Sequence, residues 1–281
     1  MTNATVISEK WPYPTWIAHR GAGTLAPENT MAAFQLGAHY GYRMFECDVK
    51  LSADHTPFLL HDSTLSRTTN HATLWGETSQ TTAGAHAWDA LATLDAGSWH
   101  SAAFAGEPLA TLKAVASWCL RHQLMLNIEI KPTPGTGKET GQVVANEAAT
   151  LWQGQAVQPL LTSFDIDALR SAKKAQPHLP RGLLLDSMPT DWLNTALDLD
   201  CVAVVCKHEL WNQDHMTALK RVGLKALAYT VNTQQQVQRL LDLGIDGMIT
   251  DRVDRFTPEA GATPHPHQGQ KSGKSLLTLS V

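Results

Sequence analysis

Two histidines and two carboxylates in the first quarter of the 281-residue chain have the spacing of a reactive site. His19 and His61 flank Glu46 and Asp48, which lie in a strand-like segment at 44–51. Side chains alternate along a strand, so the two carboxylates point to one face and the residues beside them to the other. Neighbouring buried carboxylates repel each other unless a cation or a proton lies between them. Since histidine transfers protons near neutral pH, the set predicts metal-assisted acid–base chemistry.

A third carboxylate occurs in a second strand-like segment, Asn127-Ile128-Glu129-Ile130-Lys131. Alternation places Glu129 and Lys131 on one face and the two isoleucines on the other. Taken alone, Glu129 and Lys131 could form a simple buried ion pair. Because Glu46 and Asp48 also need a counter-ion, a cation site with three carboxylates is the favoured interpretation.

The ligand types restrict the cation without identifying it. A site made only of carboxylate oxygens favours Mg²⁺ or Ca²⁺. Zinc usually recruits His or Cys, and His19 or His61 could supply such a ligand, so zinc stays open. Arg20 and Lys131 beside a cation would form a strongly positive pocket. Such a pocket suits a phosphate group, whose developing charge it would stabilise.

The composition describes a soluble globular protein, with 43% hydrophobic and 17% charged residues. A formal net charge of -4 without a basic block argues against nucleic acid as a partner. No apolar run is long enough to span a bilayer, and the N-terminus lacks the apolar core of a secretory signal. The four cysteines lack CxxC spacing, which favours buried, reduced thiols in a cytoplasmic protein.

Short apolar strands alternate with amphipathic helices along most of the chain. The predicted strands cover residues 16–19, 44–51, 57–61, 124–131, 159–164, 181–186, 201–207, 225–231 and 247–250. The predicted helices cover residues 31–40, 111–121, 138–152, 165–175, 189–197, 213–222 and 233–243. If 57–61 is a hairpin partner of the second strand, the pattern predicts a TIM (β/α)8 barrel, an α/β fold with its site at the C-terminal strand ends. An open doubly wound sheet is the alternative, but Gly21 and Gly23 lack the third glycine of a dinucleotide-binding motif.

Two segments depart from this pattern. Residues 63–107 are rich in Thr, Ala, Ser and Gly and are too long for an ordinary connection, so we expect a small insertion over the barrel mouth. Residues 257–281 are expected to be a flexible tail. The predicted organisation is one barrel domain at 15–256, and the residues carry no signal for the oligomeric state.

The candidate residues belong to motifs that occur in order over roughly residues 15–256. The motifs are His19-Arg20-Gly21, Pro27-Glu28-Asn29-Thr30, Glu46-Cys47-Asp48-Val49, Leu60-His61-Asp62 with Leu65, Arg67, Thr68 and Thr69, Asp95-Ala96-Gly97-Ser98-Trp99, Asn127-Ile128-Glu129-Ile130-Lys131, and Gly244-Ile245-Asp246-Gly247 with Thr250-Asp251. Together they resemble the glycerophosphodiester phosphodiesterase family of the cytoplasmic bacterial type.

This resemblance implies a barrel enzyme that hydrolyses small glycerophosphodiesters to sn-glycerol 3-phosphate and an alcohol. It assigns cation binding to three carboxylates, acid–base catalysis to two histidines and phosphate contact to two cationic side chains: Glu46, Asp48 and Glu129; His19 and His61; Arg20 and Lys131. We take His19 as the base and His61 as the acid for the leaving alcohol. Attack by water and attack by the glycerol 2-hydroxyl both fit these residues.

Aromatic residues near the ends of later strands are candidates for the glycerol pocket. Tyr229 stands where the family usually has Trp, which bears on substrate preference. Phe164 and Trp211 could line the pocket, although such aromatics often belong to the core. Glu28 could orient the first histidine, and Asn29 or Thr30 can cap the helix predicted at 31–40.

Two other functions are compatible with parts of the pattern. A related barrel phospholipase could act on intact lipid, but it would need an apolar interfacial rim or secretion, and neither is evident in the sequence. A catalytically inactive barrel could bind phosphate or serve as a scaffold. The presence of both histidines and all three carboxylates argues against an inactive barrel.

Overall fold

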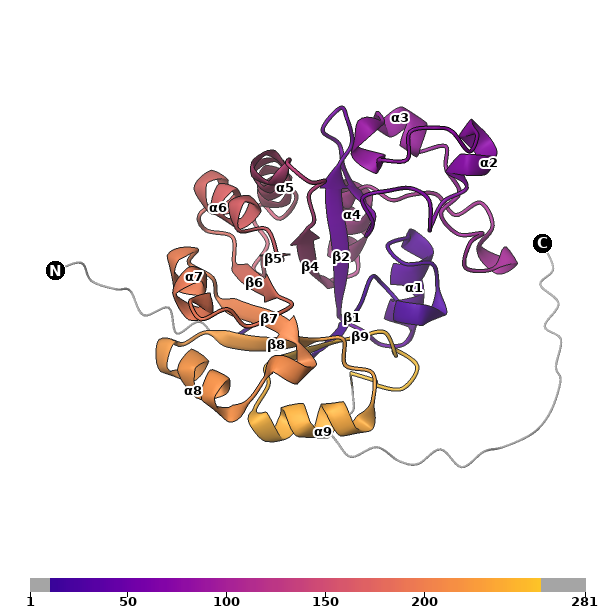
Figure 1. The fold of residues 1–281 in the computed structure, drawn as a ribbon. Helices are drawn as coiled ribbons and strands as arrows, with labels where there is room; N and C mark the ends of the chain where they lie inside the picture. The colour runs from indigo at the N-terminus through magenta and orange to yellow at the C-terminus, as the bar shows by residue number, and fades with distance from the viewer. Residues whose placement is uncertain (1–10, 259–281) are drawn as a thin grey trace, which may run out of the picture.

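The structure is a computed structural model that describes residues 11–258, in which eight parallel strands close into a barrel (Figure 1). The strands are β1 (Trp16–Ala18), β2 (Met44–Leu51), β3 (Pro57–Leu59), β4 (Met125–Ile130), β5 (Leu160–Ser163), β6 (Arg181–Leu185), β7 (Ala203–Lys207), β8 (Lys225–Tyr229) and β9 (Gly247–Thr250). β1 pairs with both β2 and β9 and so closes the ring. β3 is antiparallel to β2 and lies outside the ring. The predicted TIM barrel is confirmed.

Helices surround the strands, as Figure 1 shows. They are α1 (Met31–His39), α2 (His71–Trp75), α3 (Trp88–Leu91), α4 (Leu112–Arg121), α5 (Gly137–Leu151), α6 (Ile166–Ala175), α7 (Trp192–Asp198), α8 (Gln213–Val222) and α9 (Gln234–Leu243). Most bounds agree with the predicted ranges within one or two residues. α7 begins at Trp192 rather than at Pro189, because the Trp192 N–H donates to the Pro189 carbonyl in a turn before the helix.

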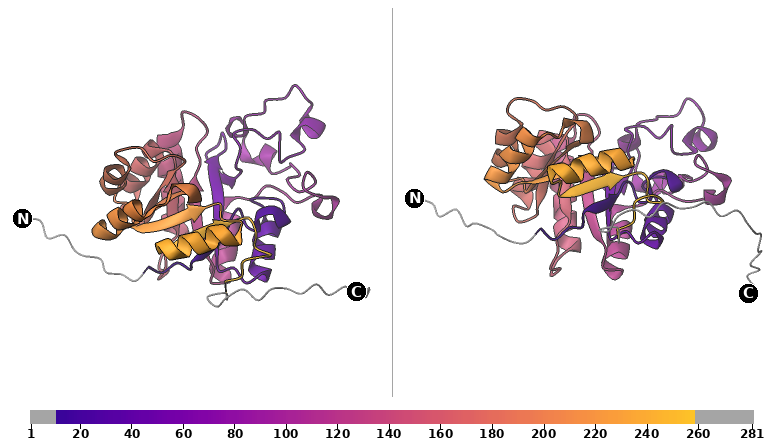
Figure 2. Two further views of the ribbon diagram at one scale, coloured as in Figure 1. Left: turned by 60° about the horizontal axis from the view of Figure 1, so that its bottom comes forward. Right: turned by 90° about the horizontal axis from the view of Figure 1, so that it is seen from below.

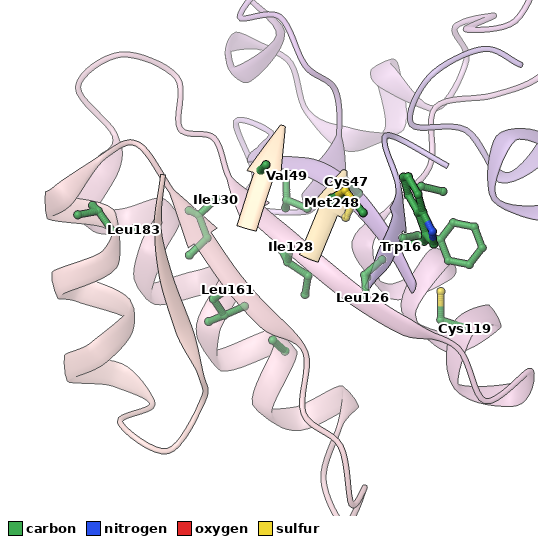
Figure 3. Packing of buried hydrophobic residues seen from close by; sticks show 14 of the residues in the cluster. Trp16, Cys47, Val49, Cys119, Leu126, Ile128, Ile130, Leu161, Leu183 and Met248 are labelled. Atoms are coloured by element: carbon green, nitrogen blue, oxygen red, sulfur yellow. The ribbon is translucent and has the colours of Figure 1, made fainter. Parts of the chain in front are cut away.

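The alternation of side chains on the strands separates a core outside the ring from the interior of the ring. Cys47 and Val49 of β2 and Ile128 and Ile130 of β4 point outward and pack between the strands and the helices (Figure 3). Met44 lies on the opposite face of β2, in a second apolar cluster with side chains of β1, β5, β6, β7, β8 and β9. This cluster fills the N-terminal part of the barrel interior, so polar side chains farther along β2 and β4 lie above an apolar base.

The segment 63–107 contains α2 and α3 and lies beside the barrel, next to the β2–β3 hairpin and α1 (Figure 2). Its apolar side chains form a separate cluster with Phe58 of β3 and with Leu60. A Glu107 carboxylate oxygen accepts from the Ala32 N–H at 2.9 Å, which ties the end of the segment to the first turn of α1.

The remaining sequence predictions concern the cysteines, membrane crossing, cellular location, nucleic-acid binding and the C-terminal tail. The four cysteines are free and buried, as expected. Within residues 11–258, no helix combines the length and the apolar character that crossing a membrane requires. The cytoplasmic location and the absence of a nucleic-acid partner stay predictions. The predicted flexible tail falls almost entirely on residues 259–281, which lie outside the described residues.

Gly141 of α5 marks a close approach between two neighbouring helices. A Cβ atom there would lie 2.1 Å from the Ala168 carbonyl oxygen of α6. We expect Gly141→Ala to lower the free energy of unfolding by about 1–3 kcal/mol, because the backbones would have to separate. Helix propensity alone predicts the opposite sign, by about 1 kcal/mol. Urea unfolding measures the difference.

The matched control is Gln142→Ala, one position along the same helix at an exposed side chain. It is expected to change the free energy of unfolding by less than about 0.5 kcal/mol. A Gly141→Ala variant as stable as the wild type would contradict the close approach of α5 and α6.

Candidate active site

Three buried carboxylates from two neighbouring strands meet inside the barrel. Strand pairing sets Asp48 of β2 directly beside Glu129 of β4. Glu46 lies two residues before Asp48 on β2 and points to the same face. One oxygen from each carboxylate lies within 4.8 Å of the others. Glu46 and Asp48 are not at the end of β2, which continues to Leu51 and pairs with β3 there.

The charges within this cluster are unequal. Burial and the Asp48 carboxylate raise the pKa of Glu46 to about 8. Burial and Asp48 also raise the pKa of Glu129. Burial alone would raise the pKa of Asp48, but Arg20 and Lys131 outweigh it and hold that pKa well below its usual range. The protein itself therefore compensates the charge of Asp48 most strongly, whereas burial beside Asp48 disfavours the charged forms of Glu46 and Glu129.

Contacts around Asp48 explain why its pKa is lowered while the pKa values of the other two carboxylates are raised. Lys131 Nζ lies 3.2 Å from Asp48 Oδ1 and 3.0 Å from Glu129 Oε1. Arg20 Nε lies 3.3 Å from Asp48 Oδ2. The Asn29 amide donates to Asp48 Oδ2 at 2.8 Å and accepts from the Asp48 N–H at 3.1 Å. Asn29 thus orients a carboxylate, and the capping role belongs to Thr30, whose side chain accepts from the N–H of residue 33.

One oxygen of Glu46 supports a cation at this place. Glu46 Oε2 accepts the Arg20 N–H at 3.0 Å, whereas Glu46 Oε1 is buried and has no hydrogen-bond partner among residues 11–258. An unpaired buried carboxylate oxygen is costly, and a divalent cation would satisfy it. The buried acidic triad of Glu46, Asp48 and Glu129 could therefore bind a metal ion, and its all-oxygen donor set fits Mg²⁺ or Ca²⁺.

His19 follows β1 and is held from the last strand of the barrel. Its Nδ1 lies 2.6 Å from Asp251 Oδ1, and its Nε2 lies 3.7 Å from Glu46 Oε2. Asp251, which follows β9, also accepts from the Asn232 amide at 2.9 Å. Burial alone would lower the pKa of His19, but the Asp251 hydrogen bond and the Glu46 charge raise it. The predicted orienting role of Glu28 toward His19 is wrong, because Asp251 occupies that position.

His61 lies just beyond β3 and is held at two points. Its Nδ1 lies 2.7 Å from Asp62 Oδ1. The fully buried Lys50 ammonium donates to the carbonyls of Leu60 at 2.6 Å and His61 at 3.2 Å, which fixes the backbone. Burial lowers the pKa of His61, and the positive charge of Arg20 contributes in the same direction. Lys50 and Asp62 are positioning groups that the sequence did not reveal as such.

A pocket of about 180 Å³ brings most of the predicted site residues together. The predicted residues that line it are His19, Arg20, Glu46, His61, Glu129, Lys131, Phe164 and Tyr229. The Phe164 and Tyr229 rings meet edge to face with centroids 6.0 Å apart. Lys131 Nζ lies 6.0 Å from the Phe164 ring centroid, so an aromatic wall adjoins the cationic side of the pocket.

Trp211 is the exception among the predicted site residues. Its indole N–H donates to the Leu227 carbonyl at 2.8 Å, and the side chain is only 2% exposed within the main apolar core. The prediction that Trp211 lines the pocket has to be corrected. Tyr229 does reach the pocket, and its hydroxyl donates to the Leu185 carbonyl at 2.9 Å.

This arrangement suits acid–base chemistry on an anionic substrate. Each of the two histidines has its Nδ1 engaged by an aspartate, which leaves Nε2 for proton transfer. Arg20 and Lys131 lie in the same pocket and can bind phosphate oxygens. Two histidines able to transfer protons, two cationic side chains able to bind phosphate and carboxylates of a candidate metal centre thus adjoin one cavity.

Comparison with known proteins identifies the family. Residues 19–255 match the Glycerophosphoryl diester phosphodiesterase family. A glycerophosphodiester phosphodiesterase of Caldanaerobacter subterraneus is 30% identical over 239 residues, which cover 84% of this chain and 93% of that protein. The structure of an Oleispira antarctica phosphodiesterase in complex with the product sn-glycerol 3-phosphate is 31% identical, with a TM-score of 0.76 and coverage of 85% of this chain and 93% of that one. The chain belongs to the glycerophosphoryl diester phosphodiesterase family of hydrolases.

Proposed function

We propose that the protein hydrolyses glycerophosphodiesters to sn-glycerol 3-phosphate and an alcohol, with a divalent cation and two catalytic histidines. One observation carries the proposal: a single pocket is lined by two aspartate-anchored histidines, two cationic side chains and two of the three carboxylates of a candidate metal centre. The product in the Oleispira antarctica relative supports the glycerol 3-phosphate half of the substrate.

Each group in the pocket has a defined task in this proposal. Arg20 and Lys131 bind the non-bridging phosphate oxygens and stabilise their charge. Glu46, Asp48 and Glu129 hold Mg²⁺ or Ca²⁺, which when bound supplies Lewis-acid polarisation of the phosphate. Phe164 and Tyr229 form the aromatic wall against the glycerol or alcohol carbons.

His19 takes the proton of the attacking hydroxyl, and His61 protonates the leaving alcohol. The protein without a cation favours the opposite assignment, with His61 as base and His19 as acid, because its environment raises the pKa of His19 and lowers that of His61. Part of the upward shift at His19 comes from Glu46, whose charge a bound cation would offset. Cation binding therefore moves His19 toward the neutral form that a base requires.

Release of sn-glycerol 3-phosphate from glycerophosphocholine, with and without chelator, tests the reaction. We expect chelator to abolish release, and His19→Ala or His61→Ala to lower kcat by about 10²–10⁴-fold. His122→Ala, at an exposed histidine that ends α4, is the matched control and should leave kcat unchanged. Absence of release with every divalent cation tried would refute the activity, and chelator-resistant release would refute the metal role.

The two histidines can also be told apart. An ester of glycerol 3-phosphate with p-nitrophenol has a leaving group that needs no protonation. His61→Ala should therefore impair this substrate far less than glycerophosphocholine, whereas His19→Ala should impair both. Preferential loss of glycerophosphocholine cleavage in His19→Ala would reverse the assigned roles. Intact phosphatidylcholine, added as a competing substrate, should not be cleaved.

Glu46→Gln tests the cation site without an activity assay. In chelator, the variant should be more stable to unfolding than the wild type by about 1 kcal/mol or more at neutral pH, because wild-type Glu46 must either take up a proton on folding or stay charged beside Asp48. The raised pKa of Glu46 means that its cost to the folded state grows as pH rises from 4.5 to about 8. The stability difference between variant and wild type should therefore widen across that window.

Mg²⁺ or Ca²⁺ should raise the Tm of the wild type and have much less effect on Glu46→Gln, because ligands that bind only the folded state stabilise it. Glu77→Gln, at an exposed carboxylate, is the control and should respond to the cation as the wild type does. An equal Tm increase in Glu46→Gln would place the cation elsewhere.

Phe164→Ala tests the aromatic wall. Phe164 is 42% exposed at the pocket, so a bound substrate would bury part of its ring. Loss of that contact should raise the KM for glycerophosphocholine about 10-fold while kcat changes little. Ile166→Ala, at a similarly exposed residue that does not line the pocket, should leave KM unchanged. An unchanged KM in Phe164→Ala would exclude the ring from substrate binding.

A further inference from the structure

Arg67 lies at the centre of a chain of ion pairs and has no role in the reaction proposed above. Its Nε and Nη2 donate to the two oxygens of Asp62 at 2.8 and 2.9 Å. Its Nη1 and Nη2 donate to the two oxygens of Glu28 at 2.8 and 2.7 Å. One guanidinium therefore holds two carboxylates in bidentate geometry, which fixes the planes of both.

Both carboxylates also contact residues with tasks in the proposed reaction. Asp62 Oδ1, which accepts from Arg67, is the oxygen that lies 2.7 Å from His61 Nδ1. Glu28 Oε1, which also accepts from Arg67, accepts from Arg20 Nη1 at 2.9 Å. The chain His61–Asp62–Arg67–Glu28–Arg20 thus links the proposed leaving-group acid to a phosphate-binding cation.

The insertion keeps the Arg67 side chain in this position. Arg67 belongs to the segment 63–107, and its guanidinium carbon lies 5.8 Å from the centroid of the Trp99 ring of the same segment. The cation over the ring face favours this orientation of a side chain that is otherwise 43% exposed. Asp62 and Glu28 are less exposed, at 27% and 13%, so Arg67 covers them from the solvent side.

We infer that Arg67 is a positioning residue through which the insertion sets the orientation of His61, whereas Arg20 at the other end of the chain keeps Asp48 as a partner without Arg67. It does not line the pocket, so it is not itself a catalytic residue. Without it, Asp62 would be free to rotate away from His61 Nδ1, and Glu28 would lose its second partner. The inference rests on the proposed function, because it assigns Arg67 an effect on the residue proposed as the leaving-group acid.

The test compares Arg67→Met and Arg67→Lys with the wild type on glycerophosphocholine and on the p-nitrophenyl ester. Arg67→Met should lower kcat for glycerophosphocholine by about 10–100-fold, the cost of misplacing a reacting group. The loss should be much smaller for the p-nitrophenyl ester, as for His61→Ala. Arg67→Lys should recover part of the activity, because an ammonium can pair with one carboxylate but cannot hold both bidentately.

A double-mutant cycle separates positioning from loss of stability. In a His61→Ala background, Arg67→Met should cost little further kcat, because residues acting through the same group are not additive. Arg170→Met, which removes an exposed arginine paired with Asp167 at 2.6 Å, is the matched control and should leave kcat and KM unchanged.

The outcomes distinguish this inference from the proposed function. An inactive wild type refutes the proposed function. If the wild type is active, an Arg67→Met loss that is equal on both substrates and additive with His61→Ala overturns the positioning role. Arg67→Met with wild-type kinetics on both substrates would overturn it as well.

Discussion

The repulsion among three buried carboxylates is the constraint on which the rest of the site depends. Pairing of β2 with β4 sets Asp48 beside Glu129, and alternation adds Glu46 to the same face. While the strands keep their register, no change of rotamer can expose these three side chains to solvent. The protein compensates Asp48 with Arg20 and Lys131 and leaves a buried oxygen of Glu46 without a partner among residues 11–258. The demand for a further positive charge thus follows from the strand pairing itself.

Closure of the barrel supplies contacts that no local segment could make. β1 lies between β2 and β9, so His19 at the end of β1 is reached by Glu46 from one side and by Asp251 from the other. The apolar cluster around Met44 fills the interior toward the N-terminal strand ends and confines the polar groups to the opposite end. Charged groups buried above such a base are weakly screened, which strengthens their effect on one another and on an anionic substrate.

Patterns within one strand can be predicted from the sequence, whereas contacts between distant segments cannot. Glu46, Asp48 and Glu129 were predictable because a period of two residues assigns faces within a strand whatever the partner strand is. Asp251 and Asn29 lie in the matched motifs, but their roles were not predictable, since each depends on which distant residue the fold brings near. Lysine side chains are usually exposed, yet the β2–β3 hairpin buries Lys50 against backbone carbonyls, and nothing in the sequence indicates this. Trp211 was misplaced because an aromatic residue after a strand carries no signal for the side to which it turns.

The two histidines are supported by different parts of the molecule, and this division has a functional consequence. His19 is anchored by Asp251 of the last barrel strand, so its position depends on closure of the barrel. His61 is anchored by its neighbour Asp62, which the insertion holds through Arg67. In the reaction proposed above, a change in the insertion therefore acts first on the side of the site assigned to the leaving alcohol, whereas a change in the barrel acts on the side assigned to the attacking group. We infer that preference for the alcohol can vary with the insertion while the barrel keeps the glycerol phosphate half constant.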